Sequence, residues 1–193
     1  MSNYNGSGTV YCNGSYSRNT LINGLAAHWR LNETTGNRVD SERDNDLTPV
    51  NSPSYTTGIF GNAAQFTSLD NQALTIDDNV KINIGSSDFT IACWVKFDNF
   101  DNADSNDFVG FAGKGAFDIP GLNNYSFALI YRPSLERMQF SFADSDSISS
   151  SATANDFGEI STGVWYFVIA SYEYSTDRAT ISVNDVENHA ISP

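Results

Sequence analysis

The stretch DFTIACWVKF, residues 88–97, decides the fold class. Its apolar side chains alternate with a second set: Phe89, Ile91, Cys93, Val95 and Phe97 against Thr90, Ala92, Trp94 and Lys96. Successive side chains of a strand point to opposite faces, so a period of two separates these sets onto two faces. The stretch therefore predicts a central core strand with one face turned toward an apolar interior.

The stretch VWYFVIASYEY, residues 164–174, predicts a second long strand. The turn residues Ser175-Thr176-Asp177 follow it, and residues 179–184 return to a strand pattern. This order is typical of a hairpin in a half-buried sheet. A further turn is expected at Asn184-Asp185, because Asn tolerates the left-handed backbone conformation.

Other short segments rich in β-branched or aromatic residues are bounded by Gly, Asn, Asp, Ser or Pro. They predict strands at residues 25–31, 62–67, 73–76, 108–114, 125–131 and 137–143. No segment of helical length keeps an apolar period of 3.6 residues. The expected fold class is all-β, a two-sheet antiparallel jelly-roll sandwich with little or no helix, and 193 residues suffice for one such core.

Residues 1–24 form a polar arm in this interpretation, because Asn, Gly and Ser cluster at residues 5–8 and 13–15. Residues 8–23 could still donate an edge strand, within the chain or to a neighbour. No basic start, signal-peptide run or membrane-spanning run is visible.

The formal net charge is −13, and the ten Lys and Arg residues are scattered singly. They form no basic patch that could bind along a phosphate backbone. An anionic lipid surface would repel the protein. Nucleic acid and membranes are therefore not expected as partners.

Four segments resemble the laminin G-like family of concanavalin A-like jelly rolls. They are GLAAHWRLNETTG at residues 24–36, GIFGNAAQF at 58–66, FTIACWVK at 89–96 and WYFVIASY at 165–172. The first two are similar to the family's aromatic-x-Leu-Asp-Glu-x-x-Gly and Gly-x-x-Gly-x-Ala-x-x-Phe patterns. The resemblance implies one jelly-roll domain over residues 25–193 that lacks the family's last strands.

Aromatic side chains in these segments are expected to fill the core. Each could contribute about 2–3 kcal/mol of burial before conformational entropy opposes it. The residues concerned are Trp29, Phe66, Phe89, Trp94 and Trp165.

No catalytic residues are expected. Glycosidases of this fold carry a Glu-x-Asp-x-x-Glu strand, and the nearest match, residues 42–47, ends in Leu47 within a polar loop. His28 and His189 are the only histidines, and neither lies in a nucleophile motif.

An acidic loop is the candidate calcium site, because carboxylate and amide oxygens are the ligands that calcium prefers. Its candidate ligands are Asp98, Asp101, Asp104 and Asp107, and a second acidic cluster comprises Asp40, Glu42, Asp44 and Asp46. The resemblance implies calcium at loop ends beside a glycan site, while ordinary solvated turns explain the same residues.

Cys12 and Cys93 permit one disulfide bridge, but a free, buried thiol is the preferred interpretation of Cys93, since it alternates with core residues.

The first function class is a non-catalytic structural or adhesive module on the exterior of a particle or cell, of the virion decoration or tail-associated type. Residues 1–24 would bind a second copy or a capsid or surface scaffold, and the expected location is extracellular or on a virion. The alternative is a calcium-assisted carbohydrate-binding module that uses Tyr125, Tyr131 and Tyr172. A glycoside hydrolase of the same fold is the remote third class.

Overall fold

The computed structural model describes residues 2–4, 10–12, 24–78, 80, 82, 87–100, 109–115, 125–143 and 149–191. The chain divides into two compact units. Unit 1 comprises Met1–Thr56, Asn62–Phe66 and Gln72–Ile82, and unit 2 comprises Thr57–Gly61, Thr67–Asn71 and Asn83–Pro193.

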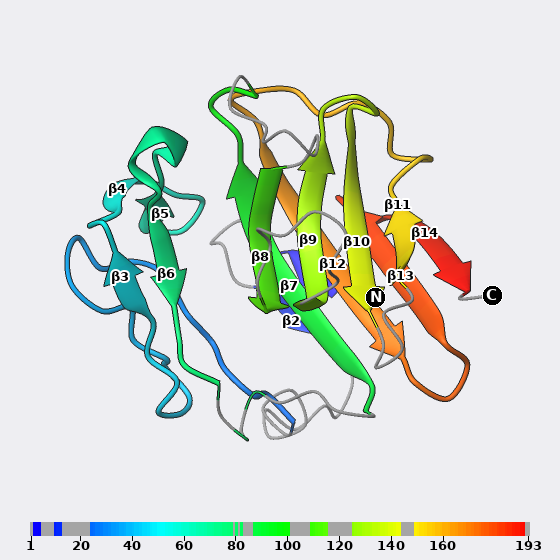
Figure 1. Ribbon diagram of the computed structural model, residues 1–193, viewed down its shortest axis with the longest axis horizontal. Coiled ribbons are helices and arrows are strands. Elements are labelled where there is room, and N and C mark those ends of the chain that lie inside the picture. Colours follow the sequence, from blue (N-terminus) through cyan, green and yellow to red (C-terminus); the bar gives the residue numbers. More distant parts are fainter. Residues whose placement is uncertain are drawn as a thin grey trace. The chain divides into compact units, whose positions relative to one another are not determined.

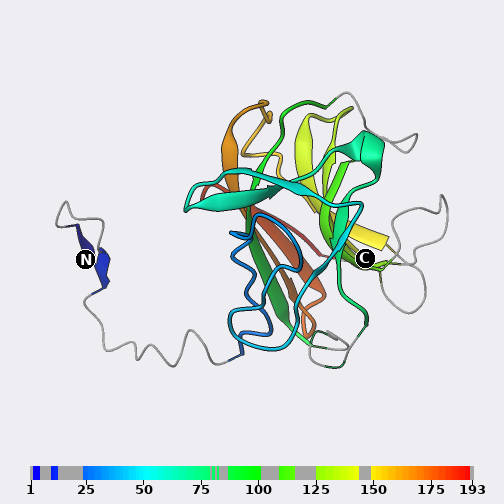
Figure 2. The same ribbon diagram turned by 90° about the vertical axis from the view of Figure 1, so that its left-hand side faces the viewer.

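Unit 2 contains two four-stranded antiparallel sheets (Figure 1). The β12 sheet has the order β14-β13-β12-β7, with β7 at Phe89–Lys96, β12 at Trp165–Glu173, β13 at Arg178–Val183 and β14 at Val186–Ile191. The β9 sheet has the order β11-β10-β9-β8, with β8 at Val109–Gly115, β9 at Tyr125–Arg132, β10 at Arg137–Ala143 and β11 at Ser149–Thr153. The two views show them as separate layers (Figures 1 and 2).

One hydrophobic core lies between these layers. The β9 sheet supplies Leu129, Met138 and Phe140, and the β12 sheet supplies Val168 and Ile181, all without exposed surface. Phe89, Ile91, Cys93 and Val95 of β7 pack against the same core, as their alternation predicted. The predicted all-β, two-sheet antiparallel sandwich is therefore confirmed.

The turns of the β12 sheet follow the sequence closely. β12 and β13 pair antiparallel up to Glu173 and Arg178, which confirms the predicted hairpin. Asn184 and Asp185 both have positive φ, 46° and 71°, and connect β13 to β14 as a two-residue turn. The turn predicted there is confirmed.

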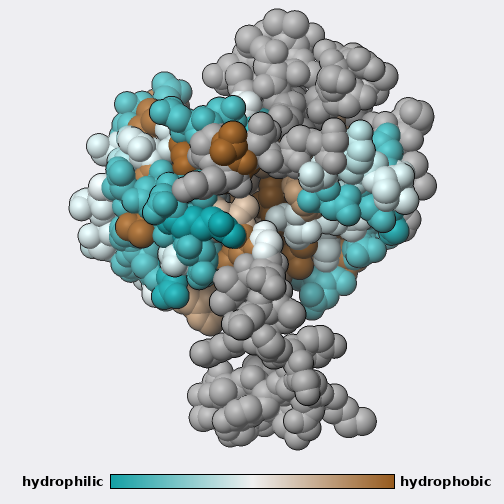
Figure 3. Space-filling view, turned by 90° about the horizontal axis from the view of Figure 1, so that it is seen from below, coloured by the Kyte–Doolittle hydropathy of each residue, from teal (hydrophilic) through white to brown (hydrophobic). Residues whose placement is uncertain are grey.

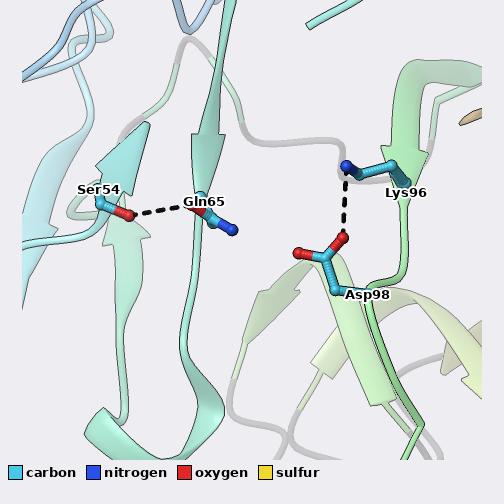
Figure 4. Close-up of polar contacts among 4 residues, drawn as sticks. All are labelled: Ser54, Gln65, Lys96 and Asp98. Atoms are coloured by element: carbon cyan, nitrogen blue, oxygen red, sulfur yellow. Dashed lines mark hydrogen bonds and ion pairs between the residues drawn. The ribbon is translucent and has the colours of Figure 1, made fainter. Parts of the chain in front are cut away.

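Unit 1 is built from short, two-stranded pairs. β1 (Ser2–Tyr4) pairs with β2 (Val10–Cys12), β3 (Thr48–Val50) with β6 (Ala73–Thr75), and β4 (Ser54–Thr57) with β5 (Asn62–Gln65). The Ser54 hydroxyl lies 3.4 Å from Gln65 Oε1 across the last pair (Figure 4). Val10–Cys12 lies within the segment 8–23 that could donate an edge strand; it pairs with Ser2–Tyr4, and residues 13–23 lie outside the described residues.

The strand predicted at residues 25–31 is wrong. Trp29 makes only an isolated bridge, to Asp40. Side chains and loop carbonyls take the hydrogen bonds of this segment instead: the His28 N–H donates to Asp40 Oδ1 at 2.9 Å, and the Trp29 indole donates to the Asn45 carbonyl at 2.6 Å. A ladder with a neighbouring strand therefore does not form here.

Two aromatic residues expected in the core are exposed. Phe66 is 47% exposed at the end of β5, and Trp94 is 44% exposed on β7. Five strands were not predicted from the sequence: β1, β3, β4, β11 and β14. The only helical turn described is the 3-10 segment η1, Ser68–Asp70, so no described helix has the length or apolarity to span a bilayer.

Candidate functional site

The outer face of the β12 sheet carries aromatic side chains, of which Trp94 is exposed and Phe167 and Trp165 are half-buried. Since Cys93 and Val168 face the core, Trp94 and Phe167 face away from it. These two residues are register partners on β7 and β12, and their ring centroids lie 5.1 Å apart at 36°. Trp165 is the next outward residue of β12, so we call Trp94, Trp165 and Phe167 the aromatic group.

Lysine 96 borders the aromatic group. Its Nζ lies 5.7 Å from the centroid of the Trp165 ring, within the range of a cation–π contact. The same Nζ lies 3.3 Å from Asp98 Oδ1 (Figure 4). A carboxylate therefore balances the positive charge beside the aromatic rings.

Hydroxyl side chains occupy the opposite end of this face. The register places Ser171 between Thr90 of β7 and Thr180 of β13, and alternation turns all three outward. We call them the hydroxyl row. Ile169, between Ala92 and Ser182, separates this row from the aromatic group. The outer face thus changes from aromatic to hydroxylated across one sheet.

The tyrosines predicted as ligand contacts lie elsewhere. Tyr131 is 2% exposed, and its ring stacks on Phe100 with centroids 4.3 Å apart, so the exposure expected of it is wrong. Tyr172 packs against Phe142 at 4.6 Å, and its hydroxyl donates to Asp177. Both rings are part of the core packing. The side chain of Tyr125 lies outside the described residues.

The calcium site predicted from the sequence is only partly within the described residues. Asp98 pairs with Lys96, while Asp101, Asp104 and Asp107 lie outside the described ranges. Within those ranges, no three His, Cys, Asp or Glu side chains come together as a metal site. The second acidic cluster, which begins at Asp40, is fully described and does not form one.

Asp40 instead stabilises the loop of unit 1. Its carboxylate accepts the backbone N–H of His28 at 2.9 Å and of Glu42 at 3.1 Å, and the Asn45 amide at 3.1 Å. Burial raises the pKa of Asp40, but these hydrogen bonds outweigh burial and leave the pKa below its ordinary value of 3.8. The group is therefore an ionised structural carboxylate at neutral pH.

The side chains of His28 and Ser41 are in contact, although the two residues are 13 positions apart in the sequence. Ser41 Oγ lies 3.0 Å from His28 Nδ1, but it also lies 3.0 Å from the His28 carbonyl oxygen, to which it donates. Among the described residues no carboxylate hydrogen-bonds the imidazole, whereas a nucleophile–base pair needs such an orienting group. This contact closes a loop rather than activating a nucleophile. The side chain of His189 is outside the described residues.

Cys93 is a free thiol in the structure, on the core face of β7. Burial raises the pKa of this thiol to about 11, so little thiolate is present at neutral pH. Cys93 is therefore a packing residue and a poor nucleophile.

Exposed apolar side chains occur elsewhere as well, including Phe60 and Leu69. In the face drawn in Figure 3, hydrophilic residues cover most of the described surface and hydrophobic residues form small groups. Single exposed apolar residues are ordinary on soluble proteins. The aromatic group differs because the rings of Trp94 and Phe167 contact one another across neighbouring strands of one sheet.

Comparisons with known proteins agree with this fold. A laminin G family model, described as the concanavalin A-like lectin/glucanases superfamily, matches residues 67–192. A solved structure, the binding domain of Paraclostridial Mosquitocidal Protein 1, is similar with a TM-score of 0.55 and 16% identity. The similarity covers 81% of this chain and only 39% of that chain. No curated protein matches the sequence. Because the family model matches well over half of the chain, the chain belongs to the concanavalin A-like lectin/glucanase superfamily.

Proposed function

We propose that this chain is a non-catalytic binding module that recognises a neutral saccharide on the outer face of the β12 sheet. The observation that carries the proposal is the contact of the exposed Trp94 with the half-buried Phe167 on the same sheet face as the hydroxyl row. A sugar ring has an apolar C–H face and a rim of hydroxyl groups. Such a ligand suits a surface that offers aromatic faces and hydroxyl donors together.

Charge favours a neutral ligand over an acidic one. Lys96 is paired with Asp98, and Arg178, the outward cation of β13, lies 3.8 Å from Glu187 of β14. With both cations balanced and a net charge of −13, the protein would repel acidic polysaccharides at a distance.

The absence of a reactive constellation among the described residues supports a non-catalytic role. Two-carboxylate hydrolysis needs an acid and a base or nucleophile across one cleft. Asp40 accepts hydrogen bonds from His28, Glu42 and Asn45, and the other acidic residues of this segment, Glu42, Asp44 and Asp46, are exposed. The solved neighbour is itself described as a binding domain, which supports the same role.

We further propose that the module is displayed on the exterior of a particle or cell, including a virion. In this setting residues 1–24 would attach the module to a scaffold or a second copy, and the outer face would adhere to a glycan. Two observations support this role of residues 1–24: their composition is polar, and they directly precede the binding module.

Replacing Trp94 should remove most of the saccharide affinity. Trp94→Ala deletes the exposed ring, and the loss of one aromatic stack of about 1.5 kcal/mol corresponds to roughly a tenfold weaker Kd. A glycan array should first identify a neutral ligand, and calorimetry should then compare the variants. Trp94→Tyr, which keeps an aromatic face, should retain part of the affinity.

Tyr174→Ala is the matched control, because Tyr174 is an equally exposed aromatic residue that lies in the turn after β12. It should bind as the unmodified protein does. Unchanged binding by a correctly folded Trp94→Ala variant would contradict the proposal, and so would an array without any bound neutral glycan.

Chelation of calcium should leave this binding unchanged. The outer face uses rings and hydroxyls, and the described carboxylates that border it, Asp98 and Glu187, lie beside cations. Calorimetry with excess calcium and with EDTA should therefore give the same Kd. A large loss in EDTA would instead favour the calcium-assisted alternative, in which Asp98, Asp101, Asp104 and Asp107 hold the ion.

A further inference from the structure

Strand β7 ends the β12 sheet with an edge that nothing in its sequence protects. Within the described part of the chain, β7 pairs with β12 alone, and this pairing runs without a break from Phe89 to Lys96. The strand has eight residues and contains neither Pro nor Gly. A long, regular edge of this kind presents a row of backbone N–H and C=O groups to which another strand can pair.

The other edges of the sandwich are less suited to pairing. β8 contains three glycines, and its register with β9 shifts at Gly110/Ala112 and again at Lys114/Gly115. Irregularities of this kind twist an edge away from an incoming strand. β11 and β14 are shorter, with five and six residues, and they lie next to one another. β7 is therefore the edge at which strand addition is expected.

The core-facing side chains of β7 are incompletely covered. Cys93 and Ile91 are half-buried, whereas their register partners on β12, Val168 and Ala170, have no exposed surface. The difference arises because β12 has a strand on each side and β7 has one on only one side. A further strand beside β7 would remove this apolar surface from water, which favours its addition.

The charges at this edge are complementary to those of a second copy of the same strand. When two β7 strands pair antiparallel about Ala92, Asp88 of each copy lies opposite Lys96 of the other. Two-fold symmetry forms this ion pair twice, once at each end of the strand. Asp88 is exposed, and its Oδ1 accepts the Tyr174 N–H at 2.8 Å, which holds the carboxylate at the start of β7.

The uncharged side chains fit the same register. The apolar, core-facing residues of β7 lie opposite one another, and Thr90 lies opposite Trp94 on the outer face. The neighbouring register, which is centred on Cys93, would place Asp88 opposite Asp98. Like charges directly opposite one another are destabilising, so the register centred on Ala92 is favoured.

We propose that β7 is a self-association interface, at which two copies of the chain pair antiparallel about Ala92. The pairing joins two four-stranded sheets into one continuous sheet with two-fold symmetry. The dimer also places two aromatic groups on one outer face. Its formation needs no saccharide, so it stands or falls independently of the binding function proposed above.

Disulfide trapping tests the register. Ala92 lies on the symmetry axis and is exposed, so Ala92→Cys should give a reducible dimer of the full-length chain under mild oxidation. Directly opposite Cβ atoms are about 4.5–5.5 Å apart, a separation from which a disulfide can form with a small adjustment. Thr90→Cys is the matched control, because it is exposed on the same face of the same strand but lies opposite Trp94. It should stay monomeric on a non-reducing gel.

A charge exchange tests the ion pairs. Asp88→Lys alone and Lys96→Glu alone each place like charges opposite one another, so each should weaken self-association roughly tenfold in sedimentation velocity. An equimolar mixture of the two variants should recover the dimer, because every pair then joins opposite charges. Tryptophan fluorescence of each variant checks that it remains folded.

Three results would overturn the proposal. The first is an unmodified protein that stays monomeric over a wide range of concentrations. The second is equal trapping of Ala92→Cys and Thr90→Cys. The third is a dimer that persists in Ala92→Lys, which sets two cations against one another at the symmetry axis. Ser182→Lys, which adds the same charge to β13 within the sheet, is the control and should leave the dimer intact.

Discussion

Phe140→Ala should lower the free energy of unfolding of unit 2 by about 3–5 kcal/mol, the usual cost of truncating a buried Phe. Phe140 has no exposed surface. Its ring lies 6.0 Å from that of Phe89, edge to face, so it joins β10 of one layer to β7 of the other. On β10 it also pairs with Leu129 on one side and Ala152 on the other. Its removal would therefore leave a cavity between the sheets.

A loss of this size is a large part of the 5–15 kcal/mol that is typical of a whole domain. Guanidinium unfolding followed by fluorescence measures it, since Trp94 and Trp165 both belong to unit 2. Leu135→Ala is the control, because Leu135 is exposed in the turn between β9 and β10 and should change stability by less than about 0.5 kcal/mol. If the two variants had the same guanidinium midpoint of unfolding, Phe140 would not be a core residue.

The sequence predicts strands well where one face is buried and apolar. Residues 88–97 alternate along their whole length, and β7 occupies Phe89–Lys96 with the predicted set toward the core. β11 has the sequence SSSAT, in which the small Ala152 is the main core contact, so no apolar period shows in it. β14 has the sequence VENHAI, in which the buried residue at position 188 is the polar Asn188. Short, polar strands of this kind form because neighbours pair with them.

The error at residues 25–31 has a different cause. The apolar content of this segment suits a strand, but its donors bond to groups of Asp40 and Asn45, more than ten residues further along the chain. Local propensity carries no information about such partners, because they are brought near only by the fold of the loop.

The candidate sites were predictable only in part. Residues 127–131 are all buried, so Tyr131 ends a continuous apolar run, and such a run could have placed it in the core. Alternation also puts Trp94 on the face opposite Cys93. Whether that outer face is exposed depends on what packs against the sheet, which one strand does not reveal.

Asp40→Ala should destabilise the loop of unit 1 by about 2–4 kcal/mol, because it leaves the donors of His28, Glu42 and Asn45 unsatisfied, and a buried unpaired donor costs about 1–3 kcal/mol. Asp40 is only 4% exposed, so water cannot fully replace the lost acceptor. Asp40→Asn should cost less at neutral pH, since one amide oxygen can still accept from part of this set. The Trp29 indole N–H, which donates to the Asn45 carbonyl, is a direct NMR probe of the loop in a thermal titration.

The pH dependence of stability distinguishes the contribution of the Asp40 charge from that of its packing. Because the folded-state pKa lies below the ordinary value of 3.8, the carboxylate binds protons less readily in the folded chain than in the unfolded chain. The stability it contributes is thus fully present above about pH 4 and is lost as the pH falls through the folded-state pKa. The difference in melting temperature at the Trp29 indole between the unmodified protein and Asp40→Asn should accordingly be largest near neutral pH and shrink in acid. A difference that stays constant down to the acid limit would mean that Asp40 acts through packing alone and that its hydrogen bonds do not favour the ionised form.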